Sequence, residues 1–309
     1  MTEQHSGFED RSDELVRTQD FETPHPIELD ISNNAGSIRI ELAETPVTHV
    51  EVRHDPSSAG PDWRSGLSGL LNWVSEQFGE SGLRPGGDGP REPLAEAVHQ
   101  TRIDLTGSRL AVRGPAAAPL RGIPLAIRIT APLESQIGVH TSGQVSVSGK
   151  AGRVQIQAAS GDVSVDESSG SATVRTSAGP LKLGSVLGGV QARSGSGDVE
   201  IASIDSPSSV VTGSGNVWIG AVHDDVLVRS GSGDLTVADA TRGQVELISG
   251  SGQLQVAVRR GVGAEVDLTS STGSATSDLA VSDEPPAEEP PLRVFGRTGT
   301  GDALIMSGI

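Results

Sequence analysis

Two short runs of alternating apolar and polar residues recur along the chain, separated by a turn of small residues. The segments VQARSGSGDVEI and VLVRSGSGDLTV show the pattern: one alternating run, a turn of Ser and Gly, and a second alternating run. Alternation with a period of two indicates a β-strand with one buried face. When the units are aligned, the inward positions form four columns between residues 154 and 256, and only Ser208 in them is polar. The columns predict one continuous core of Val, Ile, Leu and Ala.

The turn glycines set the length of the repeat. They follow one another every 18 residues, with a last interval of 19: Gly143, Gly161, Gly179, Gly197, Gly215, Gly233 and Gly252. The spacing then loosens, with Gly273 and Gly301 in comparable settings. A fixed period is the sequence signature of a solenoid, in which each unit stacks on the next.

Stacked coils explain the pattern better than an antiparallel meander does, because like strands recur only at the full period. The apolar spacing of 2, 7, 2 and 7 residues also departs from the six-residue recurrence of left-handed hexapeptide helices. We therefore predict an all-β fold, a single-stranded parallel β-helix or β-solenoid with 18-residue coils, right-handed by the usual crossover rule.

The rest of the chain is expected to be this solenoid with larger connections. Four segments are predicted: a disordered acidic segment at 1–24, the first solenoid strands at 25–54 with Gly36 in the turn position, an insertion with one or two short helices at 55–100, and solenoid repeats at 101–309. Residues 282–291, which read SDEPPAEEPP, are expected to form an extended acidic loop.

The insertion contains a strongly amphipathic stretch, LSGLLNWVSEQFGE. Its apolar residues fall on one helical face, which predicts a helix over 67–80, and a second short helix is expected over Leu94 to Val98. The first helix also carries Trp73 and Phe78. It is expected to cap one end of the solenoid, where strand edges need protection, with binding to a partner or a membrane surface as the alternative.

Composition narrows the classes of function. Aromatic residues make up only 2% of the chain, which suits a thin and regular core. The net charge of −17 disfavours nucleic acid and anionic lipid as partners. With no cysteine, thiol catalysis and Cys-based metal sites are excluded. The polar, acidic first residues and the lack of a long apolar stretch lead us to expect a cytoplasmic protein without an integral membrane segment, with envelope association as the alternative.

The repeated units SGSGDVxV and VxVRSGSGD, together with the run LAIRITAPLES, resemble the bacterial putative-adhesin family, a β-strand-repeat domain of unknown function. The resemblance covers about residues 25–309. It implies a β-solenoid encoded in bacterial envelope-stress or regulatory contexts, and it carries over no catalytic residues.

Gly-Asp pairs mark alternate turns, at Asp162, Asp198 and Asp234. A calcium site is one interpretation, but equivalent turns carry Pro180 and Asn216 instead. The aspartates therefore recur about 9.6 Å apart, too far for two of them to bind one ion. We expect them to hydrogen-bond turn backbone, and we expect no metal and no cofactor.

One outward column stands out as a candidate partner surface, because an exposed aromatic residue follows a pair of opposite charges: Lys182, Glu200 and Trp218. The alternative is that a loop or the inserted helix covers Trp218. No Ser/His/Asp arrangement with a nucleophile elbow occurs, so we predict no enzyme and no catalytic residues.

Three functional hypotheses follow. The first is a non-catalytic scaffold or interaction module for an unknown protein partner. The second is a cell-surface adhesin or envelope-binding protein, by family resemblance alone. The third is a filament-like solenoid that self-associates through its coil ends.

Overall fold

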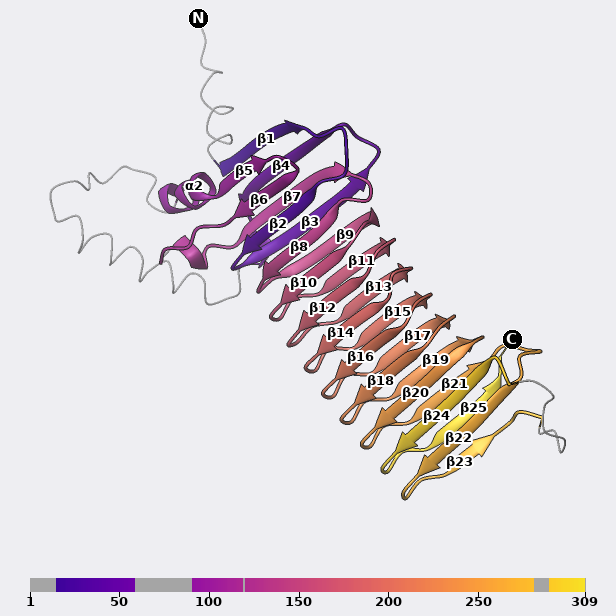
Figure 1. Ribbon diagram of the computed structural model, residues 1–309. Helices are drawn as coiled ribbons and strands as arrows, with labels where there is room; N and C mark the ends of the chain where they lie inside the picture. Colours follow the sequence, from indigo (N-terminus) through magenta and orange to yellow (C-terminus); the bar gives the residue numbers. More distant parts are fainter. Residues whose placement is uncertain (1–14, 59–90, 119, 281–288, 309) are drawn as a thin grey trace, which may run out of the picture.

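The protein is built from two long β-sheets that enclose one hydrophobic core. The computed structural model describes residues 15–58, 91–118, 120–280 and 289–308. Within them, sheet A has 13 strands and sheet B has 12, and Figure 1 shows these strands as one elongated ladder. The predicted all-β fold with parallel stacking is confirmed.

The regular part of the ladder alternates between the two sheets. In sheet A it contains β9 (Gln144–Ala151), β11 (Val163–Ser168), β13 (Leu181–Val186), β15 (Val199–Ile204), β17 (Val217–Val222), β19 (Leu235–Ala240) and β21 (Leu254–Val258). In sheet B it contains β8 (Gln136–Thr141), β10 (Val154–Ala158), β12 (Ala172–Thr176), β14 (Val190–Ser194), β16 (Ser208–Thr212), β18 (Val226–Ser230) and β20 (Gly243–Ser249). Each strand of one sheet pairs in parallel with the next strand of the same sheet, so that Val154 lies beside Ala172 and Val163 beside Leu181.

The inward columns form the core. Of the four columns read from the sequence, Ser208 is the one position that is not fully buried. Its hydroxyl donates to the carbonyl of Ser206 and accepts the amide N–H of Val190 at 2.8 Å, so this polar group is satisfied. Each buried Val, Leu or Ile side chain contributes about 1.5–3 kcal/mol relative to an exposed one.

Two further inward columns were missed by the sequence analysis. One is apolar, and each of its residues follows the preceding inward residue of the same strand by three positions instead of two, as Val186 follows Leu183. The other is polar: Thr176, Ser194, Thr212, Ser230, Ser249 and Thr298. The hydroxyls of Thr212, Ser230 and Ser249 each accept the amide N–H of the glycine three residues later. A count based on strict alternation of apolar residues finds neither column.

The turn glycines lie directly above one another. An added Cβ on Gly161, Gly197, Gly215, Gly233 or Gly252 would lie 1.8–2.2 Å from backbone of the preceding coil. We call this column the glycine ladder; in spatial order it runs through Gly36, Gly143, Gly161, Gly179, Gly197, Gly215, Gly233, Gly252, Gly301 and Gly273. The contact, more than turn conformation, requires glycine, because φ is positive only at Gly36 and Gly179 in this set.

The N-terminal part differs from the expected succession of coils. Its elements are β1 (Val16–Glu22), β2 (Glu28–Asn33), β3 (Gly36–Ala43), β4 (Val47–His54), η2 (Pro56–Ser58), α2 (Arg91–Gln100), β5 (Arg102–Thr106), β6 (Arg109–Arg113), η3 (Leu120–Gly122) and β7 (Leu125–Pro132). The coil β2–β3 lies between β6–β7 and β8–β9, so the order in space is not the order in sequence. The strands β1, β4 and β5 pair antiparallel and end the parallel ladder.

Two expectations for this region were wrong. Residues 16–22 were placed in a disordered segment, yet they form β1, because VRTQDFE alternates and Phe21 packs against the core. Residues 47–54 were expected to continue the solenoid, yet β4 runs antiparallel to both β1 and β7.

The second predicted helix is present and longer than expected. It is α2, and it contacts β1, β4 and η3 at the N-terminal end of the core. Ala97 and Val98 are fully buried there, and the Arg17 guanidinium donates to the carbonyls of His99 and Thr101. The helix predicted over 67–80 lies outside the described residues, as does most of the loop predicted over 282–291.

The C-terminal end repeats the interleaving of the N-terminal end. Its strands are β22 (Ala264–Ser270), β23 (Ala275–Ser277), β24 (Leu292–Thr298) and β25 (Ala303–Ser307). The chain first builds the outermost coil, β22–β23, and then returns to place β24–β25 between it and β20–β21. This return explains why the glycine spacing loosens, since Gly301 lies between Gly252 and Gly273.

The glycine ladder generates a stability prediction. Gly215→Ala would place a Cβ 2.1 Å from the carbonyl oxygen of Gly197, so the two coils must separate locally. Overpacking of this kind costs about 1–3 kcal/mol in the free energy of unfolding, measured by chemical denaturation. Gly263→Ala is the matched control, because an added Cβ there meets nothing within 4 Å. Equal stability of the two variants would contradict the contact.

Candidate interaction surfaces

The outer face of sheet A carries the predicted candidate column. Parallel register places Lys182 beside Glu200 and Glu200 beside Trp218. The Lys182 ammonium is 2.9 Å from a Glu200 carboxylate oxygen, and this hydrogen bond and the carboxylate charge raise the pKa of Lys182. Both side chains are more than half exposed, so solvent screens the pair and it contributes little to stability.

Trp218 is the most unusual member of this column. Its side chain is 43% exposed, and its ring lies against Gly220, where no side chain occupies the outer face. A shallow groove of about 490 Å³ runs beside the ring. Its lining includes the carboxylates of Asp198, Glu200 and Asp234 and no Lys or Arg from the described chain. The groove therefore combines an aromatic face with negative charge.

The turn aspartates hydrogen-bond to the backbone of the following coil. Asp198 accepts the amide N–H of Asn216 at 2.8 Å, Asn216 accepts that of Asp234 at 2.9 Å, and Asp234 accepts that of Gln253 at 2.7 Å. For Asp162, the equivalent position in the following coil is Pro180, which has no N–H to donate. Across the described residues no cluster of three or more His, Asp or Glu side chains could hold a metal ion.

Two predicted members of the partner surface, Trp73 and Phe78, lie outside the described residues. Among the elements that the structure describes, no helix is long and apolar enough to cross a membrane.

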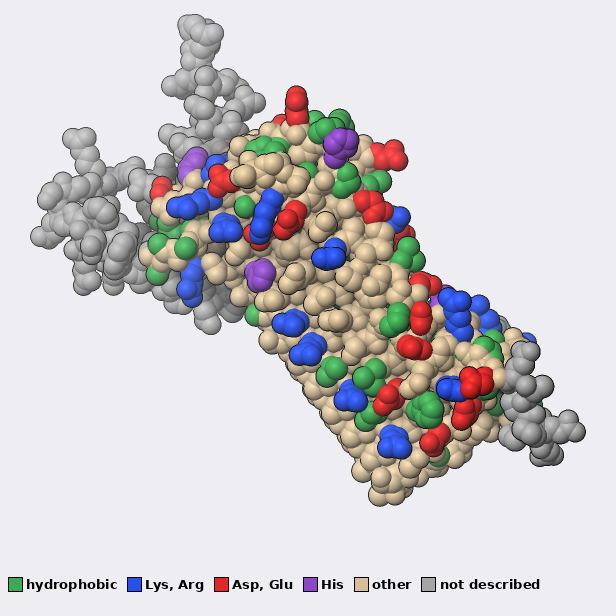
Figure 2. Space-filling view, viewed as in Figure 1, with side chains coloured by type: hydrophobic (Ala, Val, Ile, Leu, Met, Phe, Trp, Pro, Cys, Tyr) green, Lys and Arg blue, Asp and Glu red, His purple; other side chains and the backbone are tan. Residues whose placement is uncertain are grey.

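The outer face of sheet B carries a column that the sequence analysis missed. The residue after the second inward position of each unit reads, in spatial order, His140, Gln157, Arg175, Arg193, Val211, Arg229, Ile248, Arg297 and Thr269. Figure 2 shows Lys and Arg side chains spaced along the stack. The arginines at 175, 193 and 229 recur at one or two times the 18-residue period of the turn glycines, so the sequence contains the signal for this column.

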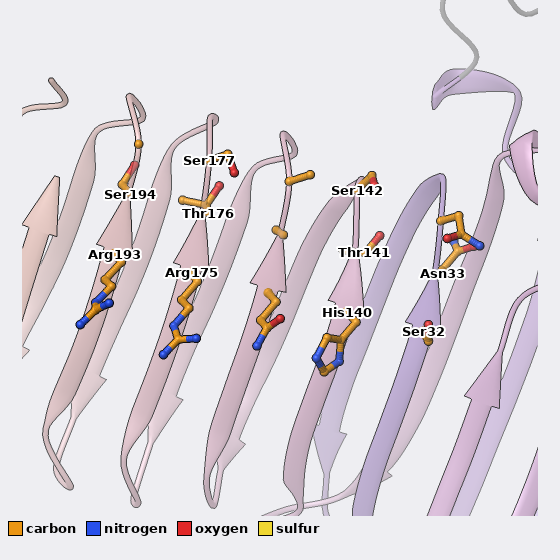
Figure 3. Close-up of a pocket in the computed structure, with 15 residues that line it drawn as sticks. Ser32, Asn33, His140, Thr141, Ser142, Arg175, Thr176, Ser177, Arg193 and Ser194 are labelled. Atoms are coloured by element: carbon orange, nitrogen blue, oxygen red, sulfur yellow. The ribbon is translucent and has the colours of Figure 1, made fainter. Parts of the chain in front are cut away.

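A shallow groove of about 680 Å³ lies over the first part of this column. In Figure 3, His140 lies on β8 and Arg175 and Arg193 lie on the neighbouring strands β12 and β14, with β10 between β8 and β12 and with Thr141, Ser142 and Ser177 near the turns. Its lining includes six side chains with Ser or Thr hydroxyls and no Asp or Glu, so the groove is polar and positively charged.

Comparison with known proteins finds one family model that matches the middle of the chain. Residues 133–224 match the family model described as Toastrack DUF4097. This segment spans β8 to β17 and includes Trp218, Arg175 and Arg193. The predicted resemblance to a putative-adhesin family of unknown function is confirmed here.

Two solved structures are similar to this chain over most of its length. A putative adhesin from Bacteroides fragilis NCTC 9343 shares 14% identity over 94% of this chain and 96% of its own, with a TM-score of 0.42. A putative cell adhesion protein from Clostridium sporogenes ATCC 15579 shares 9% identity over 94% and 99%, with a TM-score of 0.24. At TM-scores this low neither similarity carries an argument. No curated protein matches the sequence.

The contact that joins the two last coils of the stack should depend on pH. Asp302, in the turn between β24 and β25, accepts the backbone N–H and the hydroxyl of Ser274 from the outermost coil, at 2.8 and 2.9 Å. The backbone bond and then the hydroxyl bond hold the pKa of Asp302 below 3.8. A lowered folded pKa stabilises the fold above the unfolded value and loses this contribution as pH falls through the folded value.

We therefore expect the stability advantage of the wild type over Asp302→Asn to shrink between about pH 5 and about pH 3. Chemical denaturation across this range measures it. Asp267→Asn is the control, because Asp267 on β22 has no side-chain hydrogen bond with the described residues. A difference between wild type and Asp302→Asn that stays constant with pH would contradict the role of the charge.

Proposed function

We propose that the protein is a non-catalytic solenoid scaffold that binds a basic segment of a partner protein on the outer face of sheet A, at Trp218. The observation that carries the proposal is the exposed indole ring in a shallow groove, beside the carboxylates of Asp198 and Asp234 and that of Glu200, which is paired with Lys182. A Lys or Arg side chain over such a ring gains a cation–π contact and ion pairing at the same time.

The position of Trp218 favours recognition over core packing. Its inward neighbours Val217 and Ile219 are buried, so the indole ring is not needed to complete the core. Its partners in the two adjacent coils are Glu200 and Thr236, both polar. An aromatic residue of this kind within a polar rim is typical of an interface anchor.

The scaffold offers this anchor in a fixed orientation. Trp218 lies on a strand that is paired on both sides, to β15 and β19. A rigid surface loses little conformational entropy on binding, which favours affinity. In this proposal the scaffold is built from right-handed coils of 18 residues.

A hydrolytic role lacks support in the observed contacts. His223 is held by Asp205 at 2.8 Å, and the Ser203 hydroxyl approaches the same carboxylate at 3.5 Å, not the imidazole. A nucleophilic serine needs its base within hydrogen-bond reach, and His223 has no such hydroxyl partner among the described side chains. Assays of hydrolysis test the proposal that the protein is non-catalytic.

The test uses the indole as its own reporter. In a chain with Trp63→Phe and Trp73→Phe, the remaining fluorescence comes from Trp218. Titration with an oligolysine peptide should quench or shift this fluorescence and show saturation, and added salt should weaken the binding. Asp198→Asn combined with Asp234→Asn should weaken it further, because two carboxylates of the groove are neutralised and their amide oxygens still accept hydrogen bonds.

Leu187→Ala is the matched control in the same background, since Leu187 is 48% exposed and is not among the residues that line the groove. It should leave peptide binding unchanged. Equal binding by the Asp198/Asp234 variant, or no saturable change at Trp218, would contradict the proposal. The cytoplasmic location stays a prediction, which fractionation of native cells tests.

A further inference from the structure

One column on the outer face of sheet B is rich in positive charge on an acidic protein. Four exposed arginines occupy one column, Arg175, Arg193, Arg229 and Arg297, and we call them the arginine ladder. The chain as a whole has a net charge of −17. A positive column therefore forms a distinct electrostatic feature, visible among the blue side chains of Figure 2.

The ladder is not neutralised by the fold. Three other cations on the outer faces have acidic partners: Lys182 with Glu200 at 2.9 Å, Lys150 with Glu134 at 2.8 Å, and Arg109 with Asp30 at 2.8 Å. No arginine of the ladder forms an ion pair or side-chain hydrogen bond with any residue that the structure describes. Arg175 and Arg193 even lie beside each other on adjacent coils, an arrangement of like charges that disfavours the sheet.

The spacing of the ladder is regular. Arg193, Arg229 and Arg297 occur on every second coil, which places their strand positions about 9.6 Å apart. The residues between them are apolar and not buried, Val211 and Ile248. Charge and small apolar surface therefore alternate along a straight line, which fits a linear polymer whose anionic groups alternate with less polar surface.

The surroundings favour a carbohydrate polymer over a peptide. The strands of sheet B that carry the ladder are paired on both sides, so no free backbone edge is available to add a peptide strand. The groove at Arg175 and Arg193 contains hydroxyls, the Gln157 amide and the His140 imidazole, which match the hydroxyl groups of a sugar. Its apolar side chains are only alanines, Ala158 and Ala159, so it lacks an anchor pocket for a large side chain.

Two other anionic partners fit less well. Single-stranded nucleic acids bind through aromatic side chains that stack on bases, and the column contains none. Anionic lipid surfaces favour an amphipathic element with a continuous apolar face to insert, whereas the apolar side chains of this sheet face, Val211, Leu227, Ile248 and Phe295, stand among charged and polar residues.

We propose that the arginine ladder binds a linear acidic polysaccharide. The carboxylates of the polysaccharide pair with the guanidinium groups, and its sugar rings pack over Val211 and Ile248. Arg175, Arg193 and His140 hold one end of the bound chain in the polar groove. This surface is on the opposite sheet from Trp218, so the two proposals stand independently.

The test uses size-fractionated polygalacturonate as the probe, with binding measured by isothermal titration calorimetry at low and high salt. The variant Arg175→Gln/Arg193→Gln/Arg229→Gln/Arg297→Gln removes the ladder. Because an exposed ion pair is worth up to about fivefold in a binding constant, we expect at least tenfold weaker binding. The same four positions as Lys should bind more tightly than the Gln variant, since the charges remain.

The matched control removes four exposed arginines elsewhere: Arg39, Arg102, Arg153 and Arg260, each to Gln. It changes the net charge equally and should bind polygalacturonate within about twofold of the wild type. Neutral dextran should not bind, and polyglutamate should bind more weakly than polygalacturonate. No binding, equal loss in both quadruple variants, or tighter binding of polyglutamate would overturn the proposal, the last in favour of an acidic peptide.

Discussion

Close approach of backbone to backbone at the turns is the constraint on which the structure depends. In the glycine ladder, an added Cβ would lie 1.8–2.1 Å from backbone of the preceding coil at Gly197, Gly215 and Gly252. This approach brings each turn close enough for its hydroxyl and carboxamide or carboxylate side chains to bond across coils, as Asp198 does with Asn216. The same spacing sets the parallel register of both sheets, and the register aligns the outward columns. The Trp218 groove and the arginine ladder are therefore consequences of one repeated contact.

Both ends of the stack use the same device. A solenoid is weakest at its terminal coils, because each of them has only one neighbour. Here the first complete coil of the sequence, β2–β3, and the last, β24–β25, each lie between two other coils. At the N-terminal end, antiparallel strands and α2 complete the cover. At the C-terminal end β22 is the outermost strand of sheet B, and its inward residues Val266 and Leu268 are only half-buried.

The repeat could be predicted from the sequence because its information is local. Alternation around each turn identified the buried columns through Val154 and Val163, and the glycine period identified the stacking. The interleaved coils could not be predicted, because β2 pairs with β6 and β8, which are far from it in the sequence. The polar inward column through Thr212 was missed since an inward hydroxyl looks like a turn residue in sequence. The arginine ladder could have been predicted, since its period is that of the glycines. The lack of acidic partners for its arginines among the described residues could be seen only in the structure.

Hydrogen–deuterium exchange of backbone amides tests the central claim, that coils stack in the order of space and not of sequence. The coils β2–β3 and β24–β25 each lie between two other coils and form backbone hydrogen bonds with both. The account therefore predicts slow exchange for them, comparable with β14 and β16. The outermost coil, β22–β23, should exchange faster than β24–β25 although it comes earlier in the chain. Protection that instead falls steadily toward the C-terminus, with β24–β25 exchanging faster than β22–β23, would contradict the stacking order.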